Sequence, residues 1–272
     1  MVSIIVSWNN RAELWHTLPA FARCLRHKNF DITIVNYGGD SVILNQLTAS
    51  IKGKIRVIEV KNCTYFNKAK ANNIGAFYAS NPLLFFCDCD IMLDEEVFYD
   101  LIRTVQQTPM TFGTLAGIRE TEVNSREGRF IICFGYELMI RTQSGREVRI
   151  KDNEEDIQEG TRQAPGLLLC RRDDFLAVNG YNGELNGWGW EDQDMICRLT
   201  LGAGLNRIIK GIVTHISHND ASRTQAYPIV DRWESRDRMF RRALANYDNG
   251  NFSGTYQADV SESGITTPQR CR

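Results

Sequence analysis

The sequence predicts an α/β fold in which a mostly parallel β-sheet is flanked by helices on both faces. Two observations carry this prediction: apolar runs of strand length recur through the first 90 or so residues, and segments with helical spacing lie between them. Ligands of such sheets bind outside the carboxyl ends of the strands. The polar residues that follow each strand are therefore the first candidates for a functional site.

In the first half, the apolar runs and the segments between them give the elements in order. Strands are expected at 3–7, 31–36, 55–60 and 83–87, helices at 11–25 and 67–79, and a turn at 37–40. The stretch 97–163 is less regular, with strand character at 129–141 and an acidic, solvated loop at 151–161.

A regular pattern of strands and helices resumes from Ala164 onward. Strands are expected at 167–170 and 211–216, helices at 173–178, 192–201 and 229–247, and a turn at 179–181. The last of these helices is rich in arginine. After Asn249 the chain is rich in Gly, Ser and Thr, which predicts a flexible tail over 249–272.

Composition narrows the class of protein. The 272 residues carry 32 basic and 33 acidic side chains, which argues against a nucleic-acid partner bound by bulk charge. Neither a signal peptide nor an apolar run of about 20 residues is evident, so a cytoplasmic location is expected. The eight cysteines lack CxxC spacing, and free core thiols are favoured over disulfides.

An apolar strand ends in two carboxylates, Asp88 and Asp90. Side chains alternate along a strand, so these two can point the same way. A divalent cation that also binds a diphosphate would supply the counter-charge they need. The alternative is a polar strand end at a turn. Cys87 and Cys89 are expected to be core thiols rather than ligands.

Two of the four histidines, His215 and His218, follow another predicted strand. Alone they could be surface histidines. Together with the aspartate pair they favour a site for Mn²⁺ or a similar divalent ion, which imidazole and carboxylate suit.

Residues 186–194 combine glycines, two tryptophans and a run of acidic side chains. The flat face of Trp188 could pack on a sugar ring. Glu191 and Asp192 begin a predicted helix, where they could serve only as caps. The functional alternative is a general base that takes a proton from an attacking hydroxyl. Upstream, Lys68 and Lys70 could face phosphate near a helix start or lie on a solvated helix face.

Taken together, these segments resemble the β-1,4-galactosyltransferase family and the N-acetylgalactosaminyltransferase domain of bacterial chondroitin polymerases. Residues 7–11 are similar to that family's Pro-Phe-Arg-Asn-Arg turn, 66–70 to its Phe-Asn-Arg-Ala-Lys and 88–90 to its Asp-x-Asp. Residues 175–194 are similar to its stretch ending in Gly-Trp-Gly-Gly-Glu-Asp. The resemblance covers roughly 2–40, 65–95 and 164–220.

The resemblance implies a GT-A fold with a Rossmann-like sheet and an inverting transfer from a UDP-sugar. Galactose or an N-acetylhexosamine is the implied donor sugar, and a carbohydrate or glycoconjugate is the acceptor, as in glycan or polysaccharide synthesis. The implied cofactor is Mn²⁺, with Mg²⁺ as the alternative. The implied domain covers 1–248: a nucleotide-binding half at 1–95, an acceptor and metal-completing half at 96–220, and a C-terminal helix at 221–248.

Residue roles also follow from the resemblance. Asp90, His215 and His218 would hold the metal, and Asp192 would be the base. Glu191 would bind donor or acceptor hydroxyls. Contacts to the donor would come from six residues: Ser7, Arg11, Phe66, Lys68, Asp88 and Trp188. The arginine-rich C-terminal helix could also touch a membrane surface peripherally.

The sequence departs from the family pattern at Ser7 and Asn9 on the uridine side. It departs at Trp190 and Gln193 on the acceptor side, so the acceptor is not inherited. Two alternatives remain. A sugar-nucleotide nucleotidyltransferase normally has a glycine-rich loop after its first strand, and 7–11 has no glycine. A non-catalytic carbohydrate-binding protein needs aromatic residues but neither metal ligands nor a base.

Overall fold

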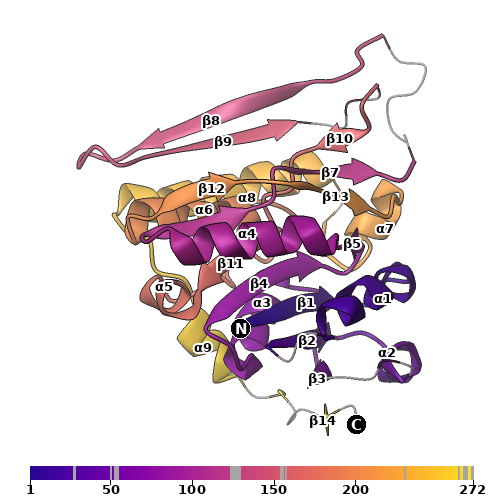
Figure 1. The fold of residues 1–272 in the computed structure, drawn as a ribbon. Coiled ribbons are helices and arrows are strands. Elements are labelled where there is room, and N and C mark those ends of the chain that lie inside the picture. Colours follow the sequence, from indigo (N-terminus) through magenta and orange to yellow (C-terminus); the bar gives the residue numbers. More distant parts are fainter. Residues whose placement is uncertain are drawn as a thin grey trace.

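A computed structural model describes residues 1–26, 29–49, 51, 55–122, 130–153, 156, 158–229, 231–262, 264–265 and 269–270. The main sheet contains strands from both predicted halves of the chain, and its strand order is β12-β6-β11-β4-β1-β2-β3-β14 (Figure 1). Strands β4, β1, β2 and β3 are parallel, and β11 is antiparallel to its two neighbours. The predicted mostly parallel sheet is therefore present.

Its strands are β1 (Val2–Trp8), β2 (Phe30–Tyr37), β3 (Ile55–Val60), β4 (Leu83–Asp88), β6 (Thr111–Thr114), β11 (Leu168–Arg171), β12 (Asn206–Ile209) and β14 (Gln269–Arg270). A smaller sheet has the order β10-β7-β13-β5. It comprises β5 (Ile91–Met92), β7 (Gly117–Glu120), β10 (Thr161–Arg162) and β13 (Ile212–His215).

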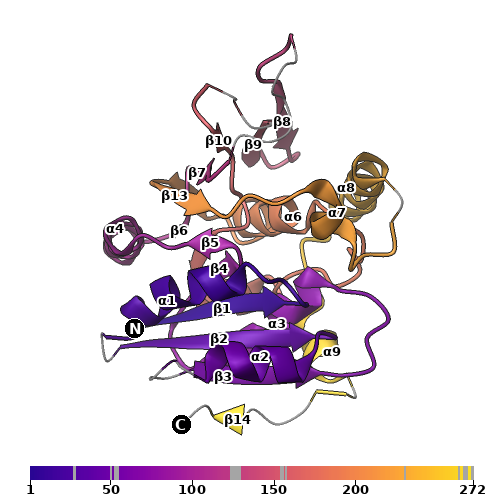
Figure 2. The same ribbon diagram turned by 90° about the vertical axis from the view of Figure 1, so that its right-hand side faces the viewer.

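Helices cover both faces of the main sheet (Figure 2). One face packs on α1 (Leu14–Cys24), α2 (Ser41–Thr48) and α4 (Glu95–Gln107). The other packs on α3 (Lys68–Tyr78), α5 (Arg172–Ala177), α6 (Glu191–Cys197) and α8 (Arg232–Asp248). Buried side chains alternate between the two faces, as Ile4 and Ile5 of β1 do, because successive residues of a strand point in opposite directions.

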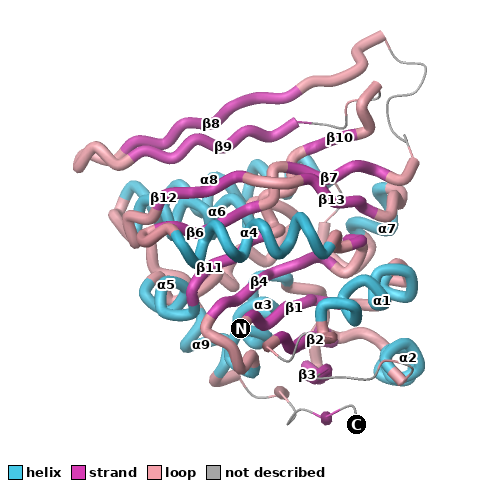
Figure 3. The backbone as a smooth tube through the Cα atoms, in the orientation of Figure 1, coloured by secondary structure: helices cyan, strands magenta, loops and turns pink. Residues whose placement is uncertain are grey.

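A separate hairpin of β8 (Gly135–Arg141) and β9 (Glu147–Asn153) lies beyond β12, at the end of the molecule away from β3 (Figure 3). The expected strand character at 129–141 is confirmed from Gly135 onward, whereas 129 lies outside the described residues. The acidic loop expected at 151–161 is wrong at its start, since β9 continues to Asn153. Residues 154, 155 and 157 of that loop also lie outside the described residues.

Further helical segments complete the second half. The helix expected at 192–201 is α6 followed by a π-helical segment, η1 (Arg198–Gly202). Buried Asp194 of α6 accepts hydrogen bonds from Arg198 Nε at 2.5 Å and from the Tyr247 hydroxyl of α8 at 2.6 Å. These bonds fix the helix that carries the predicted base. The helix expected at 229–247 is α8, whereas the C-terminal helix implied at 221–248 is divided into α7 (Asp220–Thr224) and α8.

The first part of the predicted flexible tail is folded. Residues 256–260 form α9 (Tyr256–Val260). Asp259 of α9 is buried and accepts a 2.7 Å hydrogen bond from Asn73 of α3. Tyr256 packs edge-on against Phe175. The composition of the tail wrongly predicted flexibility here, because the buried contacts that hold α9 are made with distant segments of the chain. Residues 263, 266–268 and 271–272 of that tail lie outside the described residues.

Two further observations bear on the expectations from composition. Cys24, Cys87, Cys89, Cys170 and Cys197 are buried free thiols, as predicted. Across the described part of the chain, each helix is too short or too polar to span a bilayer.

Candidate active site

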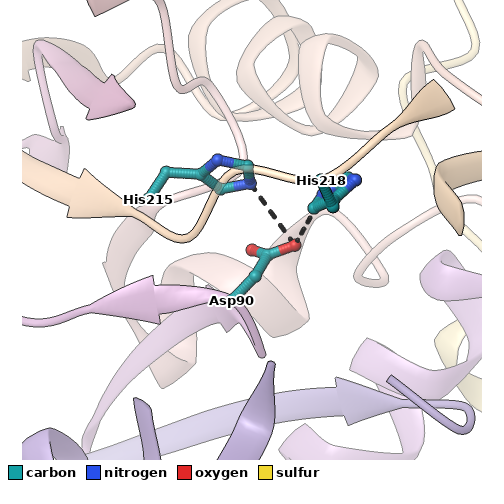
Figure 4. A group of neighbouring side chains, drawn as sticks. All are labelled: Asp90, His215 and His218. Atoms are coloured by element: carbon teal, nitrogen blue, oxygen red, sulfur yellow. Dashed lines mark ion pairs between the residues drawn. The ribbon is translucent and has the colours of Figure 1, made fainter. Parts of the chain in front are cut away.

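Asp90, His215 and His218 converge on one point (Figure 4). Asp90 Oδ2 lies 3.4 Å from His215 Nε2 and 3.2 Å from His218 Nε2. One ligand atom from each of the three residues lies within 4.8 Å of the other two. A carboxylate and two imidazoles form a donor set that fits a divalent ion such as Mn²⁺. The structure thus brings together the three predicted ligands, while their binding of metal stays a prediction.

The convergence follows from strand pairing. After β4 the chain turns at Asp90 and enters β5, which pairs antiparallel with β13 so that Ile91 lies opposite His215. The backbone N–H of Ile216 then donates to the carbonyl of Asp90 at 2.9 Å. The DxD turn and the histidine segment are therefore joined by backbone hydrogen bonds as well as by side chains.

Glu120, at the end of β7, contacts the ring nitrogen of His215 that does not face Asp90. It lies opposite His215 in the parallel β7–β13 pair, and its Oε2 is 2.6 Å from His215 Nδ1. Burial raises the pKa of Glu120, but His215 and Arg162 outweigh it and lower the pKa to about 2. An ionised carboxylate on Nδ1 leaves Nε2 free to face Asp90, an arrangement common behind metal-bound histidines. The sequence contained no local signal for Glu120.

A cation already contacts the predicted metal site. Arg11 Nη2 lies 3.0 Å from Asp90 Oδ2, and Arg11 Nε lies 3.0 Å from Glu13. Burial raises the pKa of Asp90, but His215, His218 and Arg11 lower it well below its usual value. Asp90 is therefore held ionised, as a metal ligand must be.

A second cluster centres on Lys68, at the start of α3. Its Nζ lies 2.7 Å from Asp88 Oδ1, 2.8 Å from Asp192 Oδ2 and 3.9 Å from Glu191 Oε1. Burial lowers the pKa of Lys68, but the three carboxylates raise it well above its usual value. Lys68 thus joins the end of β4 to the beginning of α6, and it lies inside the site rather than on a solvated helix face.

The pKa values of the two acidic residues of α6 are both raised. Burial and the charge of Asp192 raise the pKa of Glu191 to about 8. Burial also raises the pKa of Asp192, although Lys68 opposes this shift. Glu191 Oε2 and Asp192 Oδ1 are buried without a hydrogen-bond partner among the described residues. Buried unpaired acceptors are uncommon and point to a ligand that completes their bonds.

The predicted donor side lies at the carboxyl ends of β1 and β4. Ser7 is opposite Asp88 in the parallel β1–β4 pair, so both face the same edge of the sheet. The ring of Phe66 meets Tyr37 and Tyr227 edge-on, at centroid distances of 6.1 and 5.5 Å. The Phe66 N–H also donates to Ala226 at 2.8 Å. Tyr227 was missed from the sequence because only this long-range contact brings it to the site.

The glycine–tryptophan segment forms the opposite wall. The Trp188 N–H donates to Ser235 Oγ of α8 at 2.9 Å. Trp190 is buried, packs on Phe240 at 4.6 Å and has a φ of 74°, a left-handed conformation that is uncommon for a bulky residue. The two tryptophans therefore differ: Trp188 lines the cleft with a partly exposed side chain, and Trp190 belongs mainly to the core.

Every residue to which the resemblance gave a role lines one cleft of about 240 Å³, whereas Lys70 lies outside its lining and pairs with Glu262. The residues with a role are Ser7, Arg11, Phe66, Lys68, Asp88, Asp90, Trp188, Glu191, Asp192, His215 and His218. Lining residues that the sequence did not single out include Arg162, Tyr227, Arg232 and Arg236. The cleft places the predicted metal ligands and the predicted base in one space.

Residues 3–172 match the family model described as glycosyl transferase family 2. The chain belongs to glycosyl transferase family 2. Residues 154–219 of this glycosyltransferase also match a model described as the N-terminal domain of galactosyltransferase. That second match covers the glycine–tryptophan segment, the predicted base and both histidines. The resemblance to galactosyl- and N-acetylgalactosaminyltransferases is therefore confirmed.

Curated relatives agree with this family. Chondroitin sulfate N-acetylgalactosaminyltransferase 1 of Mus musculus is 22% identical over 219 residues, which is 71% of this chain and 36% of the mouse protein. The human protein of the same name is 22% identical over 59% of this chain and 29% of its own length. The glycosyltransferase chain thus spans about a third of the curated relatives it matches.

Solved structures confirm the GT-A fold. Residues 1–349 of TarS from S. aureus, in complex with UDP-GlcNAc, superpose with a TM-score of 0.57 at 15% identity, over 91% of this chain and 66% of that one. The mannosyltransferase PcManGT from Pyrobaculum calidifontis, in complex with GDP-Man and Mn²⁺, gives 0.57 at 10% identity, over 95% and 68%. At these identities the likeness concerns the fold alone.

Proposed function

We propose that this glycosyltransferase is inverting and divalent-metal-dependent. It moves galactose or an N-acetylhexosamine from a UDP-sugar onto a hydroxyl of a carbohydrate or glycoconjugate acceptor, in the synthesis of a glycan or polysaccharide. The observation that carries the proposal is that Asp192 shares one cleft with the Asp90–His215–His218 cluster. A non-catalytic binding protein needs neither group, and the family match gives a nucleotidyltransferase no support.

Asp90, His215 and His218 would hold the metal ion. The mixed carboxylate and imidazole donors favour Mn²⁺ over Mg²⁺, since Mg²⁺ prefers oxygen ligands. When bound, the ion would stabilise the negative charge that develops on the diphosphate leaving group. The solved mannosyltransferase complex with Mn²⁺ supports metal use in this fold.

The residues around the cluster would bind the donor. Ser7 and Phe66 lie where the strand ends meet, in position to contact the nucleotide, and Arg11 and Lys68 offer positive charge to the diphosphate. Asp88 would bind ribose or sugar hydroxyls, and Trp188 would pack on the sugar ring. The likeness to N-acetylgalactosaminyltransferases and to a structure that contains UDP-GlcNAc supports a UDP-sugar donor.

Asp192 would take the proton of the attacking hydroxyl. Glu191, whose pKa of about 8 keeps it protonated near neutral pH, can donate a hydrogen bond to a sugar hydroxyl instead. With Glu191 protonated and the charge of Lys68 favouring the ionised form of Asp192, the two neighbours can divide the roles of hydrogen-bond donor and base. A single displacement assisted by one base inverts the anomeric centre and requires no covalent nucleophile.

The test is a screen for UDP release from UDP-galactose, UDP-glucose, UDP-N-acetylgalactosamine and UDP-N-acetylglucosamine, each with Mn²⁺, with Mg²⁺ or with a chelator. Release from at least one donor, dependent on the metal, is the expected result. Where an added carbohydrate acceptor is glycosylated, proton NMR of that product reads the anomeric configuration of the transferred sugar. Retention of the donor's configuration, or release that a chelator leaves unchanged, would contradict the proposal. A cytoplasmic location and a membrane contact through α8 stay predictions.

A further inference from the structure

Aromatic rings and arginines alternate beside the cleft: Trp188, Arg232 and Arg236 line it, whereas Trp233 and Tyr136 pack next to these arginines outside its lining. Arg232 Cζ lies 4.7 Å from the ring centroid of Trp233 and 5.9 Å from that of Trp188. Arg236 Cζ lies 4.6 Å from the Trp233 ring and 5.3 Å from that of Tyr136 in β8. We name Trp188, Arg232, Trp233, Arg236 and Tyr136 the α8 wall.

The guanidinium groups of the α8 wall are oriented by these rings. A guanidinium that stacks on an aromatic face keeps its N–H donors in the plane, where they can bind a carboxylate or a phosphate. Arg236 Nη1 already donates to Asp152 at 2.8 Å. Both arginines line the cleft, so a pair of cations faces the space with Asp152 as the adjoining carboxylate.

The α8 wall adjoins the segment that carries Asp192, and Trp188 is its one member predicted to contact the donor. Ser235 of α8 holds the backbone of Trp188, and a Cβ at Gly189 would come within 3.0 Å of Arg236 Cγ. The segment that leads into Asp192 therefore packs directly on this wall. The predicted nucleotide contacts, in contrast, lie at the ends of β1 and β4.

The wall also offers a surface for sugar rings. Trp233 is 38% exposed and Tyr136 is 45% exposed, and Arg236 contacts both rings. Exposed aromatic faces pack on sugars, and the stacked arginines would select among them by charge.

We propose, on the basis of the glycosyltransferase activity proposed above, that the α8 wall is an acceptor subsite that selects glycans carrying an acidic group. The sugar next to the accepting residue bears a carboxylate or a phosphate, which Arg232 and Arg236 bind while its ring packs on Trp233. The two sources of charge share the same recognition chemistry.

The experiment measures binding by calorimetry without a donor, so that it does not depend on turnover. One probe is a hexasaccharide of alternating glucuronate and N-acetylglucosamine, and its neutral counterpart is the same hexasaccharide with the carboxyl groups reduced to alcohols. The reduced hexasaccharide, phosphorylated at the alcohols that replace its carboxyl groups, tests phosphate on the same sugar backbone. We expect at least one charged probe to bind about 10-fold or more tightly than the neutral one, as the loss of a charge-assisted hydrogen bond implies.

Two substitutions and one control on the same helix localise the effect. R232Q and R236Q should each weaken binding of the charged probe by about 10-fold. R238Q, at an exposed position of α8 outside the cleft lining, should leave it unchanged. Thermal unfolding of each variant checks that the fold is intact. Equal affinity for charged and reduced hexasaccharides, no binding of either charged probe, or an equal loss in R238Q would overturn the proposal.

The proposed function is scored separately, by UDP release from the unsubstituted protein. UDP release without a preference for acidic probes would support the proposed function and contradict this acceptor subsite. Binding of acidic probes through Arg232 and Arg236 without UDP release would support a glycan-binding surface and contradict the proposed transferase activity.

Discussion

The ammonium group of Lys68 lies 2.8 Å from Oδ2 of Asp192. This contact joins the donor side of the cleft to the residue predicted to act as the base. Lys68 also contacts Asp88 at the end of β4, so one cation is shared between donor-side and acceptor-side carboxylates. We expect a donor diphosphate to compete for this cation, which makes the ionisation of Asp192 sensitive to what occupies the cleft.

Replacement of Asp192 by Asn should lower kcat by about 10²–10⁴, the range for loss of a general base. The amide keeps the shape of the side chain but cannot accept the proton, so the affinity for UDP should change little. Steady-state kinetics and calorimetry with UDP and Mn²⁺ measure the two quantities. Glu191→Gln, which also replaces a carboxylate by an amide, is the matched control. If Asp192→Asn retains the parent rate while Glu191→Gln loses it, the roles of the two residues are exchanged.

The activity should fall with acid from a higher pH than an ordinary carboxylate of pKa about 4 would give. Burial raises the pKa of Asp192 and Lys68 opposes the shift, and only the ionised carboxylate can act as base. Lys68→Met removes the opposing charge, so the acidic limb of the kcat profile should move to higher pH. The profile is measured at saturating donor, because Lys68 is also a predicted donor contact. A limb that moves to lower pH would contradict this assignment.

Glu120→Gln should weaken Mn²⁺ binding by about 10- to 100-fold, the usual effect of losing a carboxylate behind a metal-bound histidine. Glu120 Oε2 lies 2.6 Å from His215 Nδ1 and fixes which ring nitrogen faces Asp90. A Mn²⁺ titration of UDP release measures the affinity. Glu122→Gln serves as control, since only the backbone of Glu122 bonds to the histidine segment, through Ser217. Equal metal affinity in the two variants would exclude this role for Glu120.

Asp259→Ala should lower the free energy of unfolding by about 1–3 kcal/mol, the cost of leaving buried hydrogen-bonding groups unpaired. Asp259 Oδ2 accepts hydrogen bonds from Asn73 and Thr255, both at 2.7 Å. Urea unfolding followed by circular dichroism gives the value. Gln257→Ala, at an exposed position of the same helix, should change it far less. Equal stability of the two variants would show that α9 contributes little to the fold.

The sequence predicted best what depends on local pattern. The strands β1 and β4 are largely apolar runs followed by polar residues, and their parallel pairing places Ser7 opposite Asp88. The helix α4 was missed although Phe98, Leu101, Ile102 and Val105 lie at helical spacing and are buried. The short helix α2 has an Asp40 N-cap but few turns to show a pattern.

What the sequence could not predict depends on contacts between distant segments. Glu120 reaches His215 only because β7 and β13 pair in parallel. Tyr227 reaches the site through Phe66, about 160 residues earlier in the chain. The α8 wall requires the hairpin residue Tyr136 to lie against a helix about 100 residues later. Charge and residue type alone gave no indication of these neighbours.

The most direct measurement of the central claim is UDP binding by calorimetry, with and without Mn²⁺, in the unsubstituted protein and in Asp90→Ala. Asp90 is the shared carboxylate of the proposed metal site, 3.4 and 3.2 Å from His215 and His218. The unsubstituted protein should bind UDP much more tightly with Mn²⁺ than without it, and Asp90→Ala should lose that difference. Equal UDP affinity in the two proteins under both conditions would contradict a metal-dependent glycosyltransferase built on this cleft.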